Sequence, residues 1–198
     1  MIKFNMKSSL SYTIFSIFLI SQFLVSNVSG DLENFGESLN PEILAIKKQK
    51  LTKFVVYDHN IVSPPNATAF VIVPAPNATG AGNTAFRSLT LVDNALTIGP
   101  ELNSTLVGRN QGIFAATDRE QVGLFSAFNF LMLTGKYNGS TVSIYGRNQI
   151  LNPVREFPII GGSGVFRFAK GYAEARTADF SPATGDAVIQ FTLYVLHY

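Results

Sequence analysis

An all-β fold, either a closed barrel or a sandwich of antiparallel strands, is predicted by the hydrophobic pattern of the 198-residue chain. From Lys53 onward, segments in which apolar and polar residues alternate with a period of two follow one another to the end of the chain. Stretches rich in glycine, proline, asparagine and serine separate these segments, as expected for tight turns. No stretch of convincing helical period interrupts them, so neighbouring strands are expected to pair antiparallel through short connections.

Nine segments are expected to form strands. They cover residues 53–62, 68–74, 85–93, 105–117, 122–134, 140–148, 153–160, 164–178 and 186–198. The turn-like sequences between them include SPPNAT, APNATGAGNT, IGPELNS, TGKYNGS, IIGGSG and SPATGD. The glycines of IIGGSG are followed by a segment of strand period rather than by a helix, so a tight turn is expected there instead of a phosphate-binding loop.

The first expected strand, 53–62, carries three adjacent hydrogen-bonding side chains between apolar neighbours. Alternation along the strand places Asp58 and Asn60 on the face that holds Val56, and His59 on the opposite face. Polar residues in phase with core residues are candidates for the lining of a pocket. A hydrogen-bond network at the end of a barrel, without any ligand, is the alternative explanation.

A second pair of polar residues follows the same rule further along the chain. Asn148 shares the phase of Ile144, and Arg155 shares the phase of Phe157. A barrel of about eight strands has room inside for side chains or for one small ligand. Asn148 and Arg155 are therefore further candidates for the lining of a pocket.

Strand 122–134 differs from the others because it is apolar in both phases. One phase holds Val122, Leu124, Phe128 and Phe130, and the other holds Phe125, Ala127, Leu131 and Leu133. A strand that is apolar on both faces must be covered on both faces. In a one-layer barrel the outer face then needs a partner, and a symmetric oligomer is the simplest one.

Candidates for a metal site or a nucleophile are few. The chain has no cysteine, so a disulfide framework and a thiolate metal site are both excluded. Its two histidines, His59 and His197, would have to meet beside an acid to bind a metal ion, and a hydrogen-bonded structural role is the simpler expectation. No G-x-S-x-G pattern surrounds Ser163, so a serine nucleophile is not expected. The sequence predicts neither a metal nor a cofactor.

The first thirty residues have the composition of a secretory signal peptide. Lys3 and Lys7 precede an apolar run at 12–25, and small residues end the segment at Gly30. The run is shorter than the roughly 20 residues of a membrane-spanning helix, although an uncleaved signal anchor is the alternative. We predict cleavage after Gly30 and secretion of the rest of the chain.

The secreted part divides into an N-terminal arm, 31–52, and one β-barrel domain, 53–198. Residues 1–30 contribute two lysines and no acid, so their removal lowers the count of Lys and Arg from 15 to 13, equal to that of Asp and Glu. A formally neutral surface gives no reason to expect nucleic acid or an anionic membrane as a partner. Four N-glycosylation sequons lie in this part of the chain, at Asn66, Asn77, Asn103 and Asn138.

Several longer stretches of the chain carry a family resemblance. They are HNIVSPPNATA, LTLVDNALTIGPELNSTLVGRNQGIFA, FNFLMLTGKYNGSTVSIYGRN, VREFPIIGGSGVFRFAKGYA and GDAVIQFTLYVLHY. In this order and spacing, over roughly three quarters of the chain, the sequence resembles the plant dirigent proteins. The resemblance implies an eight-stranded antiparallel β-barrel that packs as a homotrimer. It also implies secretion to the cell wall space, the apoplast, as a glycoprotein.

The resemblance also implies a function without a cofactor. Dirigent proteins of lignan biosynthesis bind phenoxy radicals, which a separate laccase or peroxidase makes from a phenylpropanoid monolignol such as coniferyl alcohol. They impose stereoselectivity on the coupling of these radicals. Related members act on quinone methides formed from isoflavonoids, so a cyclase or dehydratase is the alternative. A cell-wall binding module with no chemical role is a third possibility.

The site residues implied by the resemblance depart from the family pattern. Where the family has His-Asp-Ile, this chain has His59, Asn60 and Ile61, so an amide replaces the acid. Asn148 stands where lignan-forming members carry a second aspartate, and Arg155 matches the pocket arginine. An amide can form hydrogen bonds but cannot act as an acid.

Asp58 lies on the same face as Asn60, about 6.5 Å away along the strand, and is predicted to be the displaced acid. We therefore predict catalytic roles for Asp58 and Arg155. Substrate-binding roles are predicted for His59, Asn60, Asn148 and Arg155.

Overall fold

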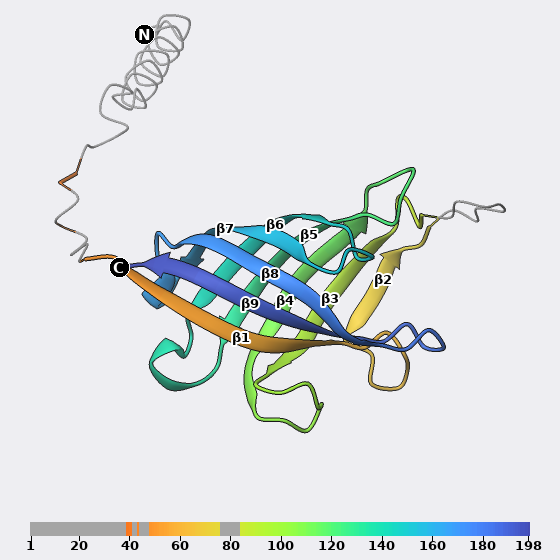
Figure 1. The fold of residues 1–198 in the computed structure, drawn as a ribbon, viewed down its shortest axis with the longest axis horizontal. Helices are drawn as coiled ribbons and strands as arrows, with labels where there is room; N and C mark the ends of the chain where they lie inside the picture. Colours follow the sequence, from red (N-terminus) through yellow and green to blue (C-terminus); the bar gives the residue numbers. More distant parts are fainter. Residues whose placement is uncertain (1–38, 41–42, 44–47, 76–83) are drawn as a thin grey trace, which may run out of the picture. The chain divides into compact units, whose positions relative to one another are not determined.

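Nine antiparallel strands form one sheet, and eight of them close it into a barrel (Figure 1). The computed structural model describes residues 39–40, 43, 48–75 and 84–198. The strands are β1 (Lys50–Asn60), β2 (Ala69–Val73), β3 (Leu89–Thr97), β4 (Leu106–Ala116), β5 (Leu124–Met132), β6 (Thr141–Asn148), β7 (Arg155–Ser163), β8 (Lys170–Phe180) and β9 (Ala187–His197). All of them belong to one compact unit, Lys47–Tyr198.

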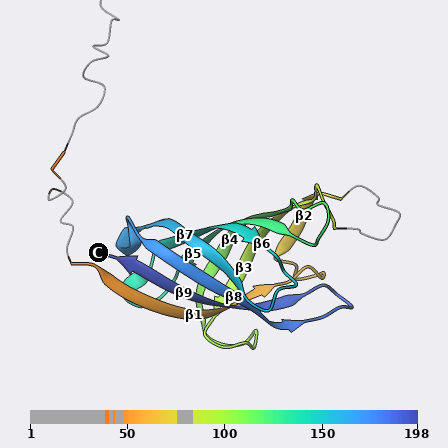
Figure 2. The ribbon, with the colours of Figure 1, turned by 45° about the horizontal axis from the view of Figure 1, so that its top comes forward.

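The barrel closes where the first strand meets the third. The sheet order runs from β1 through β9, β8, β7, β6, β5 and β4 to β3, and the end of β1 then pairs with the end of β3. Strand β2 stands outside this circuit and pairs only with β3. Figures 1 and 2 show β1, β9 and β8 side by side in front of the wall that contains β3 and β4. The predicted all-β, eight-stranded antiparallel β-barrel is therefore confirmed.

Several expected strand boundaries were wrong. The strand expected at 164–178 begins only at Lys170, because Gly164–Phe166 forms a 3₁₀ helix. Two other differences also have local reasons. The strand expected at 85–93 begins only at Leu89, because Ala85 and Arg87 have φ angles of 54° and 80°, which an extended strand does not allow. The IIGGSG stretch was expected to be a tight turn, but β7 continues through it to Ser163. A Cβ on Gly162 would clash with the carbonyl oxygen of Thr141, so the glycine permits close pairing with β6 rather than a turn.

The segments predicted to precede the barrel lie mostly outside the described residues. This holds for the whole signal peptide, 1–30, and for most of the expected arm, 31–52. The end of that arm belongs to the barrel, because β1 begins at Lys50. Among the described residues, no helix is both long enough and apolar enough to cross a membrane.

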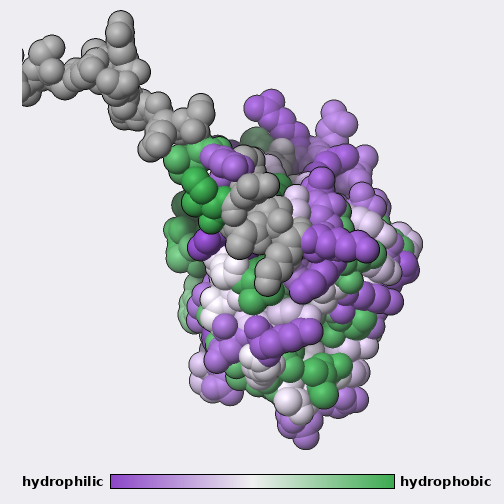
Figure 3. Space-filling model, turned by 90° about the vertical axis from the view of Figure 1, so that its left-hand side faces the viewer, coloured by the Kyte–Doolittle hydropathy of each residue, from purple (hydrophilic) through white to green (hydrophobic). Residues whose placement is uncertain are grey.

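The two faces of the barrel wall differ in character. The buried apolar side chains that form the connected core are Val56, Ala69, Val92, Leu96, Phe128, Phe130, Met132, Val142, Ile144, Phe157, Ile159, Phe166, Ala169, Ala173, Ala175, Phe191, Leu193 and Val195. They alternate along the strands with half-buried or exposed residues that face outward. In the end-on view of Figure 3, apolar residues form several separate patches among polar ones.

Aromatic side chains fill the end of the barrel at which β1 begins. The ring of Tyr137, in the 3₁₀ helix η3 (Gly135–Tyr137), lies 5.0 Å from that of Phe54 and stacks at 5.3 Å on that of Phe166. Phe166 ends a second 3₁₀ helix, η4 (Gly164–Phe166), and also contacts the ring of His197 at 5.1 Å. Space for a ligand is therefore to be sought toward the other end of the strands.

The asparagines of three sequons lie on the surface of the barrel. Asn66, Asn103 and Asn138 are all exposed, and each stands in a connection between strands. Asn77 lies outside the described residues.

Candidate functional site

A cluster of one carboxyl group and three amides lies inside the barrel, where β1, β3 and β4 are neighbours. Asp58 is only 3% exposed, and the Asn110 side chain on β4 donates a hydrogen bond from Nδ2 to Asp58 Oδ2 at 3.1 Å. Asn94 of β3 donates from Nδ2 to Asn60 Oδ1 at 3.4 Å. The register of the sheet explains why these side chains lie together. Asn94 pairs with Asn110, and Asp58 pairs with Leu96, two residues beyond Asn94 on the same face of β3.

The charged residues that precede Asn94 and Asn110 in the sequence confirm that these two amide side chains point into the barrel. Asp93 precedes Asn94 and Arg109 precedes Asn110, so alternation places both charged residues on the outer face. There the Arg109 guanidinium donates from Nε to Asp93 Oδ1 at 2.6 Å. Asn94 and Asn110 are 1% and 0% exposed, in phase with core residues.

The loop at 61–68 is held against this cluster from two directions. The Thr68 hydroxyl donates to Asn94 Oδ1 at 2.7 Å and accepts a bond from the Ile61 backbone at 3.2 Å. On the other side, Asp186 Oδ1 accepts from the Val62 and Ser63 backbone nitrogens at 2.8 and 3.0 Å, and its Oδ2 accepts from the Ser63 hydroxyl at 2.6 Å. The bonds from Ser63 contribute most to lowering the pKa of Asp186 to about 2.

Asp58 has the electrostatic character of a weak acid. Burial raises the pKa of Asp58 to about 7, and the hydrogen bonds from Asn110 and Asn94 act in the opposite direction without cancelling the effect of burial. Asp58 Oδ1 has no hydrogen-bond partner among the described residues. The carboxyl group is therefore largely protonated at mildly acidic pH, with one oxygen free to act on a bound molecule.

Asn148 of β6 is half-buried and Arg155 of β7 is buried, and each has its own polar partners. Asn148 Nδ2 donates to the Ser126 hydroxyl at 3.4 Å, and Arg155 Nη1 donates to the Ile150 carbonyl at 3.0 Å and to the Thr177 hydroxyl at 2.8 Å. Burial lowers the pKa of Arg155. In the described part of the chain, Asn148 Oδ1 and Arg155 Nε have no hydrogen-bond partner.

The structure brings together some of the predicted site residues and separates others. Asp58 and Asn60 point inward as predicted, but the hydrogen bonds of Arg155 do not reach Asp58, and no ion pair in the described residues includes either one. His59 lies on the other face of β1, where its Nε2 contacts the Thr97 hydroxyl at 2.7 Å. Its predicted contact with a substrate stays a prediction that this geometry does not favour.

The two histidines do not form a metal site. His197 pairs in the sheet with Lys50 and His59 pairs with Val188, so they lie near opposite ends of β1. The described residues contain no group of three metal-binding side chains.

Asn94 and Asn110 are the site residues that the sequence analysis missed. The signal that could have found them is the phase rule that identified Asn148. Asn94 lies between Val92 and Leu96, two residues from each, and these are core residues.

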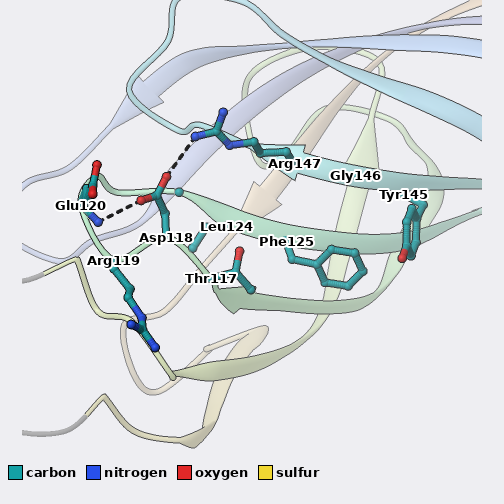
Figure 4. A pocket seen from close by; sticks show the side chains of 10 residues that line it. Thr117, Asp118, Arg119, Glu120, Leu124, Phe125, Tyr145, Gly146 and Arg147 are labelled. Carbon is teal, nitrogen blue, oxygen red and sulfur yellow. Dashed lines mark hydrogen bonds and ion pairs between the residues drawn. The ribbon is translucent and has the colours of Figure 1, made fainter.

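A cavity of about 550 Å³ is lined by residues of the connection before β5 and of β5 and β6 (Figure 4). It is lined by Thr117, Asp118, Arg119, Glu120, Gly123, Leu124, Phe125, Tyr145, Gly146 and Arg147. Asp118 accepts hydrogen bonds from the Glu120 backbone and from Arg147, and the rings of Phe125 and Tyr145 meet edge to face at 4.8 Å. None of the predicted site residues lines this cavity.

Comparison with known proteins agrees with the fold and with the quoted stretches. Residues 51–196 match the family model described as dirigent-like protein. Dirigent protein 7 of Arabidopsis thaliana is 47% identical over 166 residues, which cover 84% of this chain and 87% of the relative. Pterocarpan synthase 1 of Glycyrrhiza echinata is 37% identical over 187 residues, or 94% of this chain and 98% of the relative.

Solved structures give the same result. The barrel superposes on a pterocarpan synthase dirigent protein with a TM-score of 0.72 and 37% identity, covering 77% of this chain and 87% of the other. A second pterocarpan synthase dirigent protein gives a TM-score of 0.70 and 38% identity, covering 75% of this chain and 96% of the other. The shared barrel, the matched residues and these identities show that the chain belongs to the dirigent protein family.

Proposed function

We propose that the protein binds phenoxy radicals or quinone methides of phenylpropanoids inside its barrel and imposes stereoselectivity on their coupling, while a separate oxidase makes the radicals. The observation that carries this proposal is a buried acid of raised pKa, Asp58, which lies among amide side chains inside the barrel and has one oxygen without a hydrogen-bond partner in the described residues. Membership of the dirigent family supports a role of this type in coupling or cyclisation. Holding two reactants in one orientation selects one coupling geometry among several.

The acid has a defined task in this chemistry. Coupling of two radicals gives a quinone methide, which a side-chain hydroxyl group closes into a ring. Asp58 donates its proton to the quinone methide carbonyl oxygen, the hydroxyl oxygen forms a bond to the methide carbon, and the hydroxyl proton returns to the carboxylate. Arg155 Nε can donate a charge-assisted hydrogen bond to an oxygen atom of the bound compound.

A cyclase or dehydratase that needs no oxidase is the second candidate. The identity to a pterocarpan synthase over 94% of this chain favours it, and so does the acid. The third candidate, a binding module of the cell wall without chemistry, leaves the raised pKa of Asp58 without a use.

One experiment separates the three candidates. The protein is incubated with coniferyl alcohol and a laccase, and the coupled products are analysed by chiral chromatography. An excess of one enantiomer supports the first candidate. Conversion of an isoflavonoid alcohol without any oxidase supports the second, and racemic product together with no conversion would leave the binding module.

We also propose that the protein is secreted to the apoplast as a glycoprotein. On plant-expressed protein, we expect cleavage after Gly30 and a glycan on at least two of Asn66, Asn77, Asn103 and Asn138. Three of these asparagines are exposed in connections where a glycan meets no core residue. Peptide mapping with and without a glycosidase measures this, and a mature protein that carries no glycan would count against secretion.

The trimer is proposed from the outer face of β5. Phe125, Ala127 and Leu131 lie half-buried on that face and form an apolar row that a second copy of the chain could cover. Light scattering of the deglycosylated mature protein is expected to give about three times the monomer mass. A monomer at micromolar concentration would contradict the trimer, and Leu131→Asp should weaken the assembly more than the same change at the exposed Leu102, in the connection between β3 and β4.

A further inference from the structure

We infer that Asp58 and Asn110 together form a subsite for one hydroxyl group, the phenol hydroxyl of the bound compound. In this subsite Asp58 Oδ1 donates a hydrogen bond to the phenol oxygen, and Asn110 Oδ1 accepts the phenol proton. The inference rests on the proposed function, because it assigns the position of a phenolic compound inside the barrel.

The hydrogen bond between the two side chains fixes which atoms face the ligand. Asn110 Nδ2 donates to Asp58 Oδ2 at 3.1 Å, so Oδ2 is used as an acceptor. The proton of the neutral carboxyl group then resides on Oδ1, which has no partner among the described residues. Asn110 is thus a positioning residue for the acid, as well as a contact of the ligand.

Asn110 supplies the second half of the subsite. Its side chain is fully buried, and its Oδ1 also lacks a hydrogen-bond partner in the described residues. A buried amide oxygen without a donor is costly, so a donor from a ligand is favoured there. The two unpartnered oxygens belong to side chains that already share a hydrogen bond, and we place the hydroxyl group of the ligand between these oxygens.

A hydroxyl group matches this pair better than other oxygen groups do. One neighbour donates and the other accepts, and a hydroxyl both accepts and donates. An ether or a carbonyl would leave Asn110 Oδ1 unpaired, and a carboxylate would place a second acceptor against it. The phenol oxygen is also the atom that must meet the acid, because it becomes the quinone methide carbonyl.

The surrounding elements contribute no other charge to this pair. In the sheet, Asp58 is flanked by Ile189 of β9 and Leu96 of β3, and the inward groups nearest to it along the cluster are the amides of Asn60 and Asn94. Among the described residues, no ion pair includes Asp58. The hydrogen bond from Asn110 is therefore the main specific influence on the acid, apart from its burial.

Binding of two probes without an oxidase tests the inference. Coniferyl alcohol and 3-methoxycinnamyl alcohol, which lacks only the phenol hydroxyl, are compared by isothermal titration calorimetry. The wild type is expected to prefer coniferyl alcohol by roughly tenfold. Asn110→Leu should abolish this preference, Asn110→Ser should retain part of it, and the exposed Asn129→Leu on β5 should leave it unchanged.

A second measurement reports on the positioning role and does not depend on binding. In a ¹³C NMR titration of the aspartate carboxyl carbons, loss of the bond from Asn110 should raise the pKa of Asp58 in both Asn110 variants, while Asn129→Leu has no effect. Equal affinity of the wild type for both probes would overturn the subsite and leave the proposed function standing. Failure of the wild type to bind either probe would also overturn the subsite, whereas the proposed stereoselective coupling is overturned only by racemic product in the chiral assay. An unchanged pKa in Asn110→Leu would overturn the positioning role.

Discussion

Replacement of Asp58 by asparagine is expected to lower the yield of the stereochemically pure product by about 10²–10⁴-fold, the usual effect of losing a general acid. The barrel should remain folded, because asparagine has nearly the same shape and can still accept a hydrogen bond from Asn110. The measurement is chiral chromatography of the products formed from coniferyl alcohol and a laccase.

Two further variants make this result specific to the position of the acid. Asp93→Asn removes a carboxylate on the outer face of the neighbouring strand, where it pairs with Arg109, and should leave the product unchanged. Asn60→Asp alone adds a second acid two residues along β1, and combined with Asp58→Asn it moves the acid to that position. Full stereoselectivity in Asp58→Asn would remove Asp58 from the mechanism, and a gain in Asn60→Asp would show that the native position of the acid serves another reaction.

Periodicity predicted the fold well because most of the barrel is made of neighbouring antiparallel strands. Each of the nine expected segments corresponds to an observed strand. The pattern could not show which strands close the circuit, since the pairing of β1 with β3 joins residues about forty positions apart, such as Tyr57 and Thr97. It also could not show that Gly161 and Gly162 belong to a strand, because glycine is typical of turns and of close strand pairing alike.

The candidate site was predicted only in part, because an inward polar residue is easy to recognise among apolar neighbours and hard to recognise among polar ones. Asp58 and Asn60 interrupt an apolar strand, so their phase is conspicuous in the sequence. Asn110 stands in the stretch Gly-Arg-Asn-Gln-Gly, where polar residues and glycine on both sides hide the same phase. Hydrogen bonds between strands, such as the one from Asn110 to Asp58, depend on register, which the sequence of each strand alone does not reveal.

Asp58→Asn is also expected to stabilise the protein at neutral and alkaline pH, although it removes the acid. Folding raises the pKa of Asp58 from its ordinary value of 3.8 to about 7. The folded protein therefore holds a proton that the unfolded chain has lost throughout this window. The stabilising contribution of this proton is complete below pH 3.8, declines as the pH rises, and is absent above about pH 7.

Asparagine cannot ionise, so the free energy of unfolding of the variant should not show this decline. The two proteins should be similarly stable near pH 4, and by pH 8 the variant should be more stable by up to about 4 kcal/mol, since one pKa unit corresponds to about 1.4 kcal/mol. Urea denaturation of deglycosylated protein at pH 4, 6 and 8, at one protein concentration, measures the difference. Asp186 does not disturb the comparison, because its lowered pKa of about 2 makes its contribution complete above its ordinary value of 3.8, and that contribution is lost only as the pH falls toward 2. Parallel pH profiles for the two proteins would mean that Asp58 ionises normally in the barrel. Asp58 could then not deliver a proton near neutral pH, and the acid mechanism would fail together with the stability prediction.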